Sequence, residues 1–443
     1  MTDDAYLTLP IDVESATGLA RQGLRMSLLD TDDAAAFASW LGAVGRGFQD
    51  GRATPEVVEA RRVTAGQRRN SGVWDETLLD PATPVATVAG WPSQLSVPGH
   101  LSLGAWAVSA VTVSPTHRRR GVAGALIEAE LRTAQALGLP VVALTVSEAT
   151  IYSRWGFAPA AMAADWTIDT SRVTWTGPMV PGRVQFVEAD RLVTEGAELV
   201  ERVRLATPGQ MSFDGVLWER LIGRGVGLEE QAKSLRFIRY ADEHGVPQGF
   251  AVYKVLEETR TTVARAVVEL HYLVSATDDA YAALWRFLIE LDLVGEIRAP
   301  LRSIDEPVYW QVDDARAVVK HDEREHLWIR ILDVPAMLTG RRYHTPGHFV
   351  LDVSDPLMYA AGRFLLTVQA DGTAVVSELE GDIPGDTAAV ALTVNELGSI
   401  YLGGVSASTL FRAGRIQELT PGAAAVLDRT FHAATTPWLS IWF

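Results

Sequence analysis

The chain has 443 residues, of which 48% are hydrophobic and 21% charged, and because this length is too great for one hydrophobic core, two to three domains are expected. The formal net charge of −16 argues against a basic nucleic-acid surface, and it fits either a cationic small-molecule partner or the plain solubility of an acidic protein. The absence of cysteine excludes disulfides, thiolate zinc sites and a cysteine nucleophile.

The N-terminus and the hydropathy of the chain predict a cytoplasmic protein. The opening MTDDAYLTLP is acidic and lacks the basic and apolar segments of a secretion signal. No apolar run approaches the ~20 residues that a membrane-spanning helix needs, so no membrane span is expected.

The first third of the chain has the pattern of an α/β domain. In chain order we predict two helices, two strands, a helix and a strand, over residues 33–50, 55–67, 83–91, 101–114, 118–138 and 139–146. Asp32 or Asp33 can cap the first helix, and Gly138 marks the end of the third. The last strand is apolar throughout, as in the centre of a sheet.

A change in composition separates a second segment. Residues 167–191, with Pro178, Pro181 and neighbouring glycines, are predicted to be a linker. The segment 185–300 again alternates helices and strands but lacks an arginine-glycine loop. It therefore has the pattern of a degenerate copy of the first segment.

A third segment begins at about residue 305. Alternating runs predict strands over 347–355, 362–379 and 389–404, with a hairpin turn at Asp371-Gly372. A helix is expected over 420–436, which indicates a small mixed α/β domain. The chain ends in the apolar WLSIWF, where a polar tail would be usual.

Residues 111–124, VTVSPTHRRRGVAG, join a predicted strand to a predicted helix through an arginine-glycine loop. The first amides of a helix lack internal partners and lie at its positive end, where a phosphate can bind. Arg118, Arg119 and Arg120 add charge-assisted hydrogen bonds, and Gly121 lets the backbone approach a ligand closely. An arginine cluster alone is typical of a solvated surface, but its position before a helix favours phosphate binding.

Tyr152 has two interpretations. In IYSRWGFAP, residues 151–159, it is either packed beneath a helix or is a proton donor to a thiolate.

Two motifs resemble those of the GCN5-related N-acetyltransferases. The spacing Arg-x-x-Gly-x-Ala begins at Arg118, and Tyr-x-x-x-Gly-Phe begins at Tyr152. The longer stretches VSPTHRRRG and SEATIYSRWGFAPA, together with the length and domain order, are similar to the Eis (enhanced intracellular survival) family of aminoglycoside acetyltransferases. The resemblance covers the whole chain in architecture, while the specific motifs cover about 110–160 and the terminus.

This resemblance implies an α/β (α+β) fold of three domains. Residues 1–172 would be an acetyltransferase domain that binds acetyl-CoA, 173–304 a degenerate second one, and 305–443 a sterol-carrier-like domain. It further implies acetyl transfer to amines of a cationic acceptor such as an aminoglycoside, at one or several positions, without a metal. A homohexamer is implied as well.

The resemblance also implies a role for each matching residue. Tyr152 would be the general acid, and the C-terminal carboxylate of Phe443 the general base. The other interpretation of Phe443, an apolar end docked for stability, is compatible with this role because docking would hold the carboxylate still. Acetyl-CoA would be bound by Val111, Thr112, Val113, Arg118, Arg119, Arg120, Gly121, Val122, Ala123, Gly124, Ser147 and Glu148. The acceptor would contact Phe48, Asp50 and Trp442.

Two positions depart from the family pattern. The residue before the terminus, often acidic in the family, is Trp442, and Thr145 stands where a histidine is expected. Both departures indicate a pocket that is less acidic or differently shaped. Two other hypotheses stay open: acetyl transfer to protein lysine or another amine metabolite, and a non-catalytic acyl-CoA-binding or lipid-binding protein.

The remaining candidate motifs are assigned to loops or to the surface. His344 and His348 are interrupted by proline and glycine, so they do not share a helical face. His321 and His326 lack metal-ligand spacing, and the glycines of GRGVG, 223–227, lack the strand-to-helix setting of a dinucleotide loop. No metal site is predicted.

Overall fold

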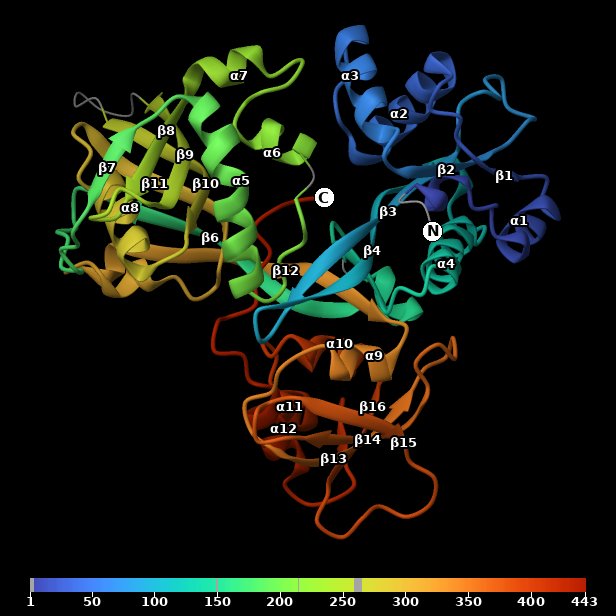
Figure 1. Cartoon of the computed structure of the whole chain (residues 1–443). Helices are drawn as coiled ribbons and strands as arrows, with labels where there is room; N and C mark the ends of the chain where they lie inside the picture. Colours follow the sequence, from blue (N-terminus) through green and yellow to red (C-terminus); the bar gives the residue numbers. More distant parts are fainter. Residues whose placement is uncertain (1–3, 149, 214, 259–264) are drawn as a thin grey trace.

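The computed structural model describes residues 4–148, 150–213, 215–258 and 265–443, and these residues form a twelve-stranded sheet and a five-stranded sheet. Figure 1 shows the large sheet passing through two lobes, one blue to green and one green to yellow, above an orange and red domain. We call these parts the first half, the second half and the C-terminal domain.

The elements of each part follow in chain order. The first half consists of α1 (Val13–Ala20), β1 (Arg25–Leu28), α2 (Ala34–Phe48), α3 (Pro55–Ala65), β2 (Arg69–Trp74), β3 (Ala86–Val97), β4 (Leu101–Val113), α4 (Val122–Ala136), β5 (Val141–Thr145), the 3-10 turn η3 (Tyr152–Trp155) and β6 (Ala158–Asp169). The second half consists of β7 (Arg183–Phe186), α5 (Ala189–Ala206), α6 (Gly215–Leu221), α7 (Glu229–Ser234), β8 (Leu235–Ala241), β9 (Pro247–Glu258), β10 (Arg265–Ser275), α8 (Asp278–Ile289), β11 (Val294–Arg302) and β12 (Val318–Ile331). The C-terminal domain consists of α9 (Val334–Thr339), β13 (Gly347–Ser354), β14 (Gly362–Val368), β15 (Ala374–Glu378), β16 (Ala388–Thr393), α10 (Val394–Tyr401), α11 (Ala407–Arg412), β17 (Gln417–Glu418) and α12 (Ala423–Phe431).

Local sequence explains the helix ends near the site. Asp33 caps α2, because its side chain accepts from the backbone amides of Ala35 and Ala36. The apolar face of α2 buries Phe37 and Trp40 against the sheet.

The large sheet is assembled from strands that are distant in the sequence. Its order is β1-β2-β3-β4-β5-β12-β6-β11-β10-β9-β8-β7, so β12 lies between β5 and β6 of the first half. The β12 strand is antiparallel to both neighbours, and β6 also pairs with β11. The two halves therefore share one continuous hydrogen-bonded sheet.

The C-terminal domain packs on the first half through one joint core. Ile329 and Ile331 of β12 belong to the same buried cluster as Leu397 of α10 and Leu427 of α12. Its five strands have the order β15-β14-β13-β16-β17, and β14 and β15 form the hairpin predicted at Asp371-Gly372.

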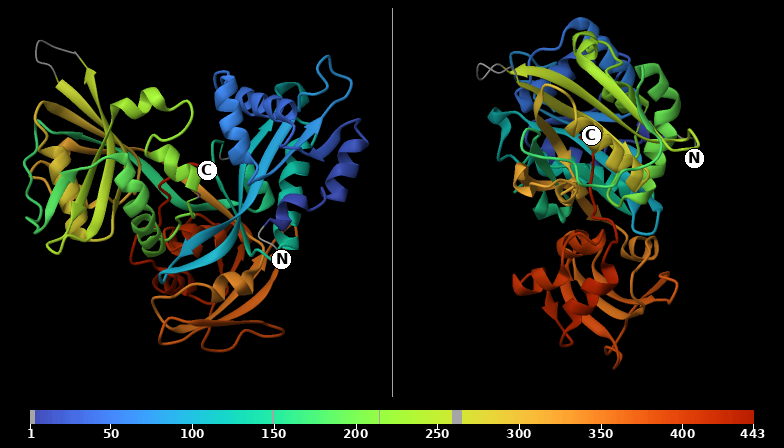
Figure 2. Two further views of the ribbon diagram at one scale, coloured as in Figure 1. Left: turned by 45° about the horizontal axis from the view of Figure 1, so that its top comes forward. Right: turned by 90° about the vertical axis from the view of Figure 1, so that its left-hand side faces the viewer.

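The last residues of the chain leave the C-terminal domain. After α12, residues 432–443 run without helix or strand, and the C-terminus lies between the two lobes of the large sheet (Figures 1 and 2). We call this segment the tail.

Three of the sequence predictions differ from the structure. Residues 389–404 were expected to be extended, but β16 ends at Thr393, which begins α10 with a capping box to Glu396. The predicted linker at 167–191 contains β7 and the start of α5. The third domain was placed from residue 305, whereas β12 belongs to the large sheet and the compact C-terminal domain starts at α9.

No helix in the described part of the chain is both long and apolar enough to cross a membrane.

Candidate active site

Strands β4 and β5 separate near the centre of the large sheet. They pair in parallel only at Trp106–Val142, Ala107–Ala143 and Val108–Leu144 in the described chain. A bulge follows in β4, where Ala110 has a φ of 53° and the register against β3 shifts. Thr112 and Val113 still pair with β3, but among the described residues no strand covers the other edge of 111–113, so this edge is suited to hydrogen-bond an extended ligand arm.

The arginine-glycine loop lies at the N-terminus of α4, as the sequence predicts. Gly121 is the N-cap with a φ of 74°, and no side chain caps the first turn. Apart from its chain neighbours, no described atom lies within 4 Å of a Cβ built at Gly121, so the space beside this residue is open. Arg118 and Arg119 are exposed, while Arg120 donates to the Gln22 carbonyl oxygen at 3.0 Å. This end of α4 fits a phosphate group.

Tyr152 begins η3, in the segment that connects β5 to β6. Its ring lies edge-on to Trp155 and Phe157, with centroid distances of 6.5 and 6.0 Å. Burial, followed by the charge of Glu148, raises the pKa of Tyr152 to about 12. In the described residues its hydroxyl has no hydrogen-bond partner, and Tyr152 lines a cavity. Tyr152 therefore stays protonated and able to donate into that cavity.

The turn after Tyr152 is fixed by a buried ion pair. Arg330 of β12 donates to the Trp155 carbonyl oxygen at 2.6 Å and to both carboxylate oxygens of Asp355 at 2.7 and 2.8 Å. Gly156 has a φ of 83°, and a Cβ there would lie 2.5 Å from Arg330 Nε. Glycine is therefore required at position 156 both for the turn and for the packing of the guanidinium.

The tail ends at the point where β4 and β5 part. The oxygen of Phe443 accepts from Ser109 Oγ of β4 at 2.9 Å and from Thr145 Oγ1 of β5 at 3.3 Å. The Phe443 ring lies edge-on to Trp91, with centroids 6.0 Å apart. One hydroxyl from each diverging strand thus holds the last residue of the sequence in the gap between them.

A cavity of about 110 Å³ joins Tyr152 to the end of the tail. Its walls are lined by Phe48, Val108, Ser109, Ala110, Val111, Leu144, Thr145, Ser147, Tyr152, Trp442 and Phe443. Within the described chain, this lining includes no aspartate or glutamate side chain. Phe48 reaches the cavity because α2 approaches β4 closely at Gly47, where a Cβ would lie 2.4 Å from Thr112 Cγ2.

The structure brings some of the predicted site residues together and leaves others apart. Phe48, Tyr152, Trp442 and Phe443 share the cavity. Asp50 is exposed after α2 and does not line it. Of the residues predicted to bind acetyl-CoA, Val111 and Ser147 line the cavity. The side chains of Thr112 and Val122 are buried, and Glu148 is exposed. The half-buried members are Val113 on β4 and Ala123 and Gly124 on α4.

Four residues of the site region were not singled out for these roles from the sequence. Ser109 and Thr145 hold the Phe443 oxygen, and Gln210 and His326 contact the tail. The assignment of His326 to a loop or the surface was wrong, because it lies in β12 with 0% of its surface exposed. Its position in an alternating apolar run, EHLWIRI, was the available signal for a buried strand.

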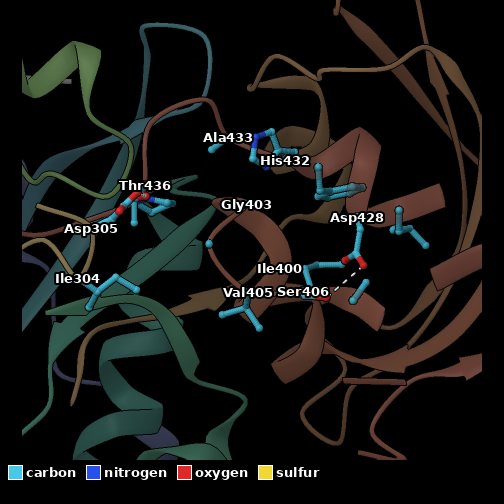
Figure 3. A pocket seen from close by; sticks show the side chains of 15 residues that line it. Ile304, Asp305, Ile400, Gly403, Val405, Ser406, Asp428, His432, Ala433 and Thr436 are labelled. Atoms are coloured by element: carbon cyan, nitrogen blue, oxygen red, sulfur yellow. Dashed lines mark hydrogen bonds between the residues drawn. The ribbon is translucent and has the colours of Figure 1, made fainter. Parts of the chain in front are cut away.

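A separate cavity of about 550 Å³ lies between the C-terminal domain and the end of the second half (Figure 3). Among the residues that the structure describes, none lines both cavities. Asp428 in its wall accepts from Ser406 Oγ at 3.1 Å and from the Ser408 amide, and so caps α11. Asp305 accepts from Thr436 Oγ1 at 3.4 Å. Both carboxylates are thus engaged by neighbouring groups of the chain.

In the described residues, no group of three or more His, Asp or Glu side chains is arranged to hold a metal ion.

Comparison with known proteins agrees with this architecture. The acetyltransferase (GNAT) domain family matches residues 31–160 and 209–331, and the sterol carrier protein domain family matches 334–440. An uncharacterised N-acetyltransferase of Streptomyces avermitilis is 33% identical over 409 residues, covering 90% of this chain and 95% of the relative. A GCN5-related N-acetyltransferase from Anabaena variabilis shares the fold, with a TM-score of 0.76 at 18% identity over 95% of this chain and 100% of that chain.

The fold, the parted strands and these relatives define the class: the chain is an acetyl-CoA-dependent N-acetyltransferase with tandem acetyltransferase domains and a sterol-carrier-like domain. The N-acetyltransferase Eis of Mycobacterium tuberculosis is 33% identical over 368 residues, which cover 80% of this chain and 85% of that protein. The crystal structure of Eis1 from Mycobacterium abscessus matches 95% of this chain and 100% of that chain, with a TM-score of 0.78 and 26% identity. The chain belongs to the Eis family of N-acetyltransferases.

Proposed function

We propose that this enzyme transfers the acetyl group of acetyl-CoA to a primary amine, with Phe443 as general base and Tyr152 as general acid. A primary amine with a pKa near 10 is mostly protonated at neutral pH, so it must lose a proton before it attacks the thioester. The C-terminal carboxylate accepts this proton, directly or through water. The Tyr152 hydroxyl then donates to the departing thiolate.

One observation carries the proposal: the Phe443 oxygen and Tyr152 face the same cavity where β4 and β5 part. The uncovered edge of residues 111–113 leads from this cavity toward the arginine-glycine loop of α4. Acetyl-CoA bound along that edge would present its pyrophosphate to the amides and arginines of the loop. Its thioester would then lie in the cavity between the proposed base and acid.

The acceptor class follows from the cavity and the charge of the chain. The net charge of −16 supports a cationic acceptor such as an aminoglycoside, acetylated at one or several amines. A second candidate is an amine attached to an aromatic or apolar body, because Phe48 and Trp442 line the cavity without an acidic side chain. Protein lysine and other amine metabolites are further acceptors to include in the test.

The deciding experiment measures thiol release from acetyl-CoA with four acceptor classes: aminoglycosides, polyamines, arylalkylamines and lysine peptides. It compares an N-terminally tagged chain ending at Phe443 with the same chain extended by a short C-terminal peptide. Turnover is expected only from the chain ending at Phe443, with equal acetyl-CoA affinity in both. Equal turnover from the extended chain would remove the carboxylate from its role, and acetyl-CoA binding without turnover on any amine would favour a non-catalytic acyl-CoA carrier.

We further propose an oligomeric state and a cellular location for the enzyme. The family resemblance supports a homohexamer, and the acidic chain supports a cytoplasmic enzyme without nucleic-acid or membrane partners. Sedimentation equilibrium of the purified chain tests the first point: a mass near six times 48.1 kDa is expected. A monomer would contradict the hexamer.

A further inference from the structure

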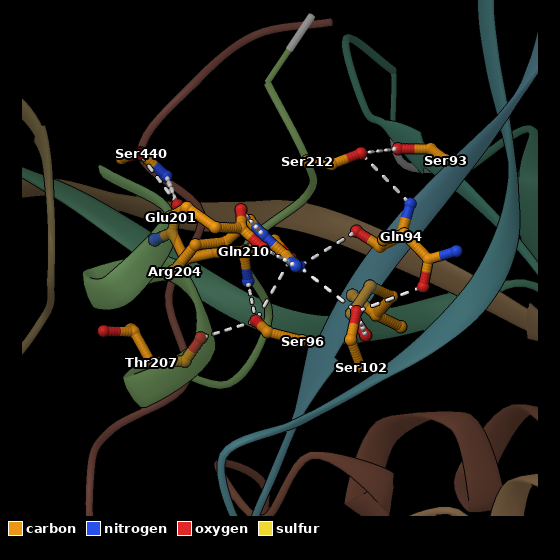
Figure 4. A network of polar contacts seen from close by, with 11 residues as sticks. Ser93, Gln94, Ser96, Ser102, Glu201, Arg204, Thr207, Gln210, Ser212 and Ser440 are labelled. Atoms are coloured by element: carbon orange, nitrogen blue, oxygen red, sulfur yellow. Dashed lines mark hydrogen bonds and ion pairs between the residues drawn. The ribbon is translucent and has the colours of Figure 1, made fainter. Parts of the chain in front are cut away.

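A loop of the second half is attached to β3 of the first half. Residues 207–212, which we call the clamp loop, follow α5 and extend along the edge of β3 (Figure 4). The Ser96 amide donates to the Gln210 carbonyl oxygen, the Gly209 amide to the Ser96 carbonyl oxygen and the Ser212 amide to the Gln94 carbonyl oxygen, each at 2.9 Å. The clamp loop therefore has a fixed position relative to the strands that build the cavity.

The side chain of Gln210 holds the tail at two points. It is 4% exposed, and its Nε2 donates to the Trp438 carbonyl oxygen at 2.7 Å. Its Oε1 accepts from Ser440 Oγ at 2.8 Å and from the Ser440 amide at 3.3 Å. The Trp438 amide adds a bond to the carbonyl oxygen of Pro208 in the same loop, at 3.0 Å. Both functional atoms of the amide side chain are thus engaged by the tail.

His326 of β12 holds the tail one residue further on. Its Nε2 lies 2.7 Å from the carbonyl oxygen of Ile441, and because a carbonyl only accepts, Nε2 must carry the hydrogen. The imidazole ring lies edge-on to Trp442, with centroids 4.5 Å apart. Burial lowers the pKa of His326 to about 4, so the ring is neutral over the working range of most enzymes.

These anchors limit where the Phe443 oxygen can lie. An unanchored tail of the 12 residues 432–443 could extend to roughly 40 Å from its root. With Ile441 fixed, the two residues beyond it reach at most about 7 Å. Few positions of Phe443 are then possible, so less conformational entropy is lost when its oxygen binds the hydroxyls of Ser109 and Thr145.

We infer that Gln210 and His326 are positioning residues that set the Phe443 oxygen in the active-site cavity. The second half lacks an arginine-glycine loop, and its contribution to the reaction is to hold the end of the chain through the clamp loop. This inference rests on the proposed role of the Phe443 carboxylate.

The test uses the full chain with Gln210→Leu. This change removes the hydrogen bonds to Trp438 and Ser440 and puts an apolar side chain of similar size in place of the amide. Gln248→Leu is the matched control, because both atoms of its amide are also engaged, by Asp242 and Arg202, away from the tail. Three quantities are compared: kcat, the Kd of acetyl-CoA, and the rate at which a carboxypeptidase releases Phe443. Ser440→Ala, which leaves the clamp loop intact, is the second variant if Gln210→Leu does not fold.

For Gln210→Leu we expect release of Phe443 to accelerate at least about tenfold, because three hydrogen bonds of ordinary strength are lost. The kcat should fall by a similar factor while the Kd of acetyl-CoA stays within about twofold, a split that general destabilisation would not give. Gln248→Leu should change none of the three. Ser440→Ala should show smaller changes in the same direction.

Unchanged release of Phe443 in Gln210→Leu and Ser440→Ala would overturn the inference whatever the kcat. Faster release with unchanged kcat would also overturn it, and the chain extended beyond Phe443 then separates two causes. If that extended chain is inactive, only the positioning role has failed. If it turns over normally, the carboxylate base has failed as well.

Discussion

At the residue scale, Tyr152 shows that packing and catalysis need not be alternatives. Its ring contacts Trp155 and Phe157 in the core, and its hydroxyl has access to the cavity that contains Phe443. Packing fixes the direction of the phenol, and burial keeps it protonated, with a pKa of about 12. A buried ring is therefore a suitable support for a proton donor.

Replacing Tyr152 with Phe should keep the packing and remove the donor. We expect kcat to fall by about 10²–10⁴ because general-acid catalysis is lost, with little change in the Kd of acetyl-CoA. Steady-state kinetics and calorimetric titration measure these quantities. Tyr309→Phe in the second half is the control and should behave as the unmodified enzyme. A fully active Tyr152→Phe would show that Tyr152 has a packing role only.

A second residue predicts how stability depends on pH. Glu130 of α4 is 2% exposed and accepts from Trp106 Nε1 at 2.7 Å, and burial raises its pKa to about 7. Its pKa in the unfolded chain is near 4.3, so the unfolded state loses its proton first as pH rises. Glu130 therefore lowers the free energy of unfolding by up to about 3 kcal/mol between pH 4.5 and pH 7.

Replacing Glu130 with Gln should remove this loss. The free energy of unfolding of the variant, relative to that of the unmodified chain, should rise by up to about 3 kcal/mol from pH 5 to pH 8. Glutamine carries no charge at either pH, so only the unmodified chain is destabilised as pH rises. Urea unfolding at the two pH values measures the difference. A stability difference between variant and unmodified chain that is the same at both pH values would contradict a buried, titrating Glu130.

At the element scale, the sequence predicted elements whose ends have local causes. The α2 helix has Asp33 as its cap, and the β14–β15 hairpin has Asp371-Gly372 at its turn. One helix that was not predicted, α10, also has a local signal, the capping box from Thr393 to Glu396, but a preceding strand with the same apolar character obscured it. Apolar runs of this length do not distinguish strand from helix by periodicity alone.

The contact between α2 and β4 gives a prediction for an element. Gly47→Ala would place a Cβ 2.4 Å from Thr112 Cγ2, so the end of α2 must move away from β4 and take Phe48 with it. We expect a loss of about 1–3 kcal/mol in the free energy of unfolding and a rise in the KM of the acceptor.

Gly42→Ala in the same helix is the matched control. Outside the backbone of α2 itself, no atom of the described residues lies within 4 Å of a Cβ at Gly42, so alanine there should raise stability by up to about 1 kcal/mol through helix propensity alone. Chemical denaturation and acceptor kinetics measure both variants. If Gly47→Ala behaved like Gly42→Ala, the close approach of α2 would not position Phe48.

At the scale of the whole molecule, the parts that the sequence did not predict are those made by distant segments. The arginine-glycine loop and Tyr152 lie within about 45 residues of one another and were found from their motifs. In contrast, Ser109 and Thr145 meet Phe443 across about 300 residues, and β12 pairs with β5 across more than 170. Single-sequence patterns report local structure and carry no information on such pairings.

The shared sheet predicts that the first half cannot fold alone. A fragment of residues 1–172 lacks β12, so β5 and β6 would have no strand between them. We expect this fragment to be unfolded or aggregated by circular dichroism and size-exclusion chromatography. Joining residues 313–333 to it through a flexible linker should restore a cooperative unfolding transition, and a well-folded 1–172 would show that β12 is dispensable.

The position of β12 in the sequence also determines when the large sheet can be completed during synthesis of the chain. A ribosome completes β6 and must add about 160 more residues before β12 is available, which takes about 10–30 s at ordinary rates of synthesis. Throughout that interval β5 and β6 expose unpaired edges, and such edges template pairing with other chains. We therefore expect the nascent chain to be prone to aggregation during translation, and conditions that slow elongation between residues 169 and 331 should increase this aggregation.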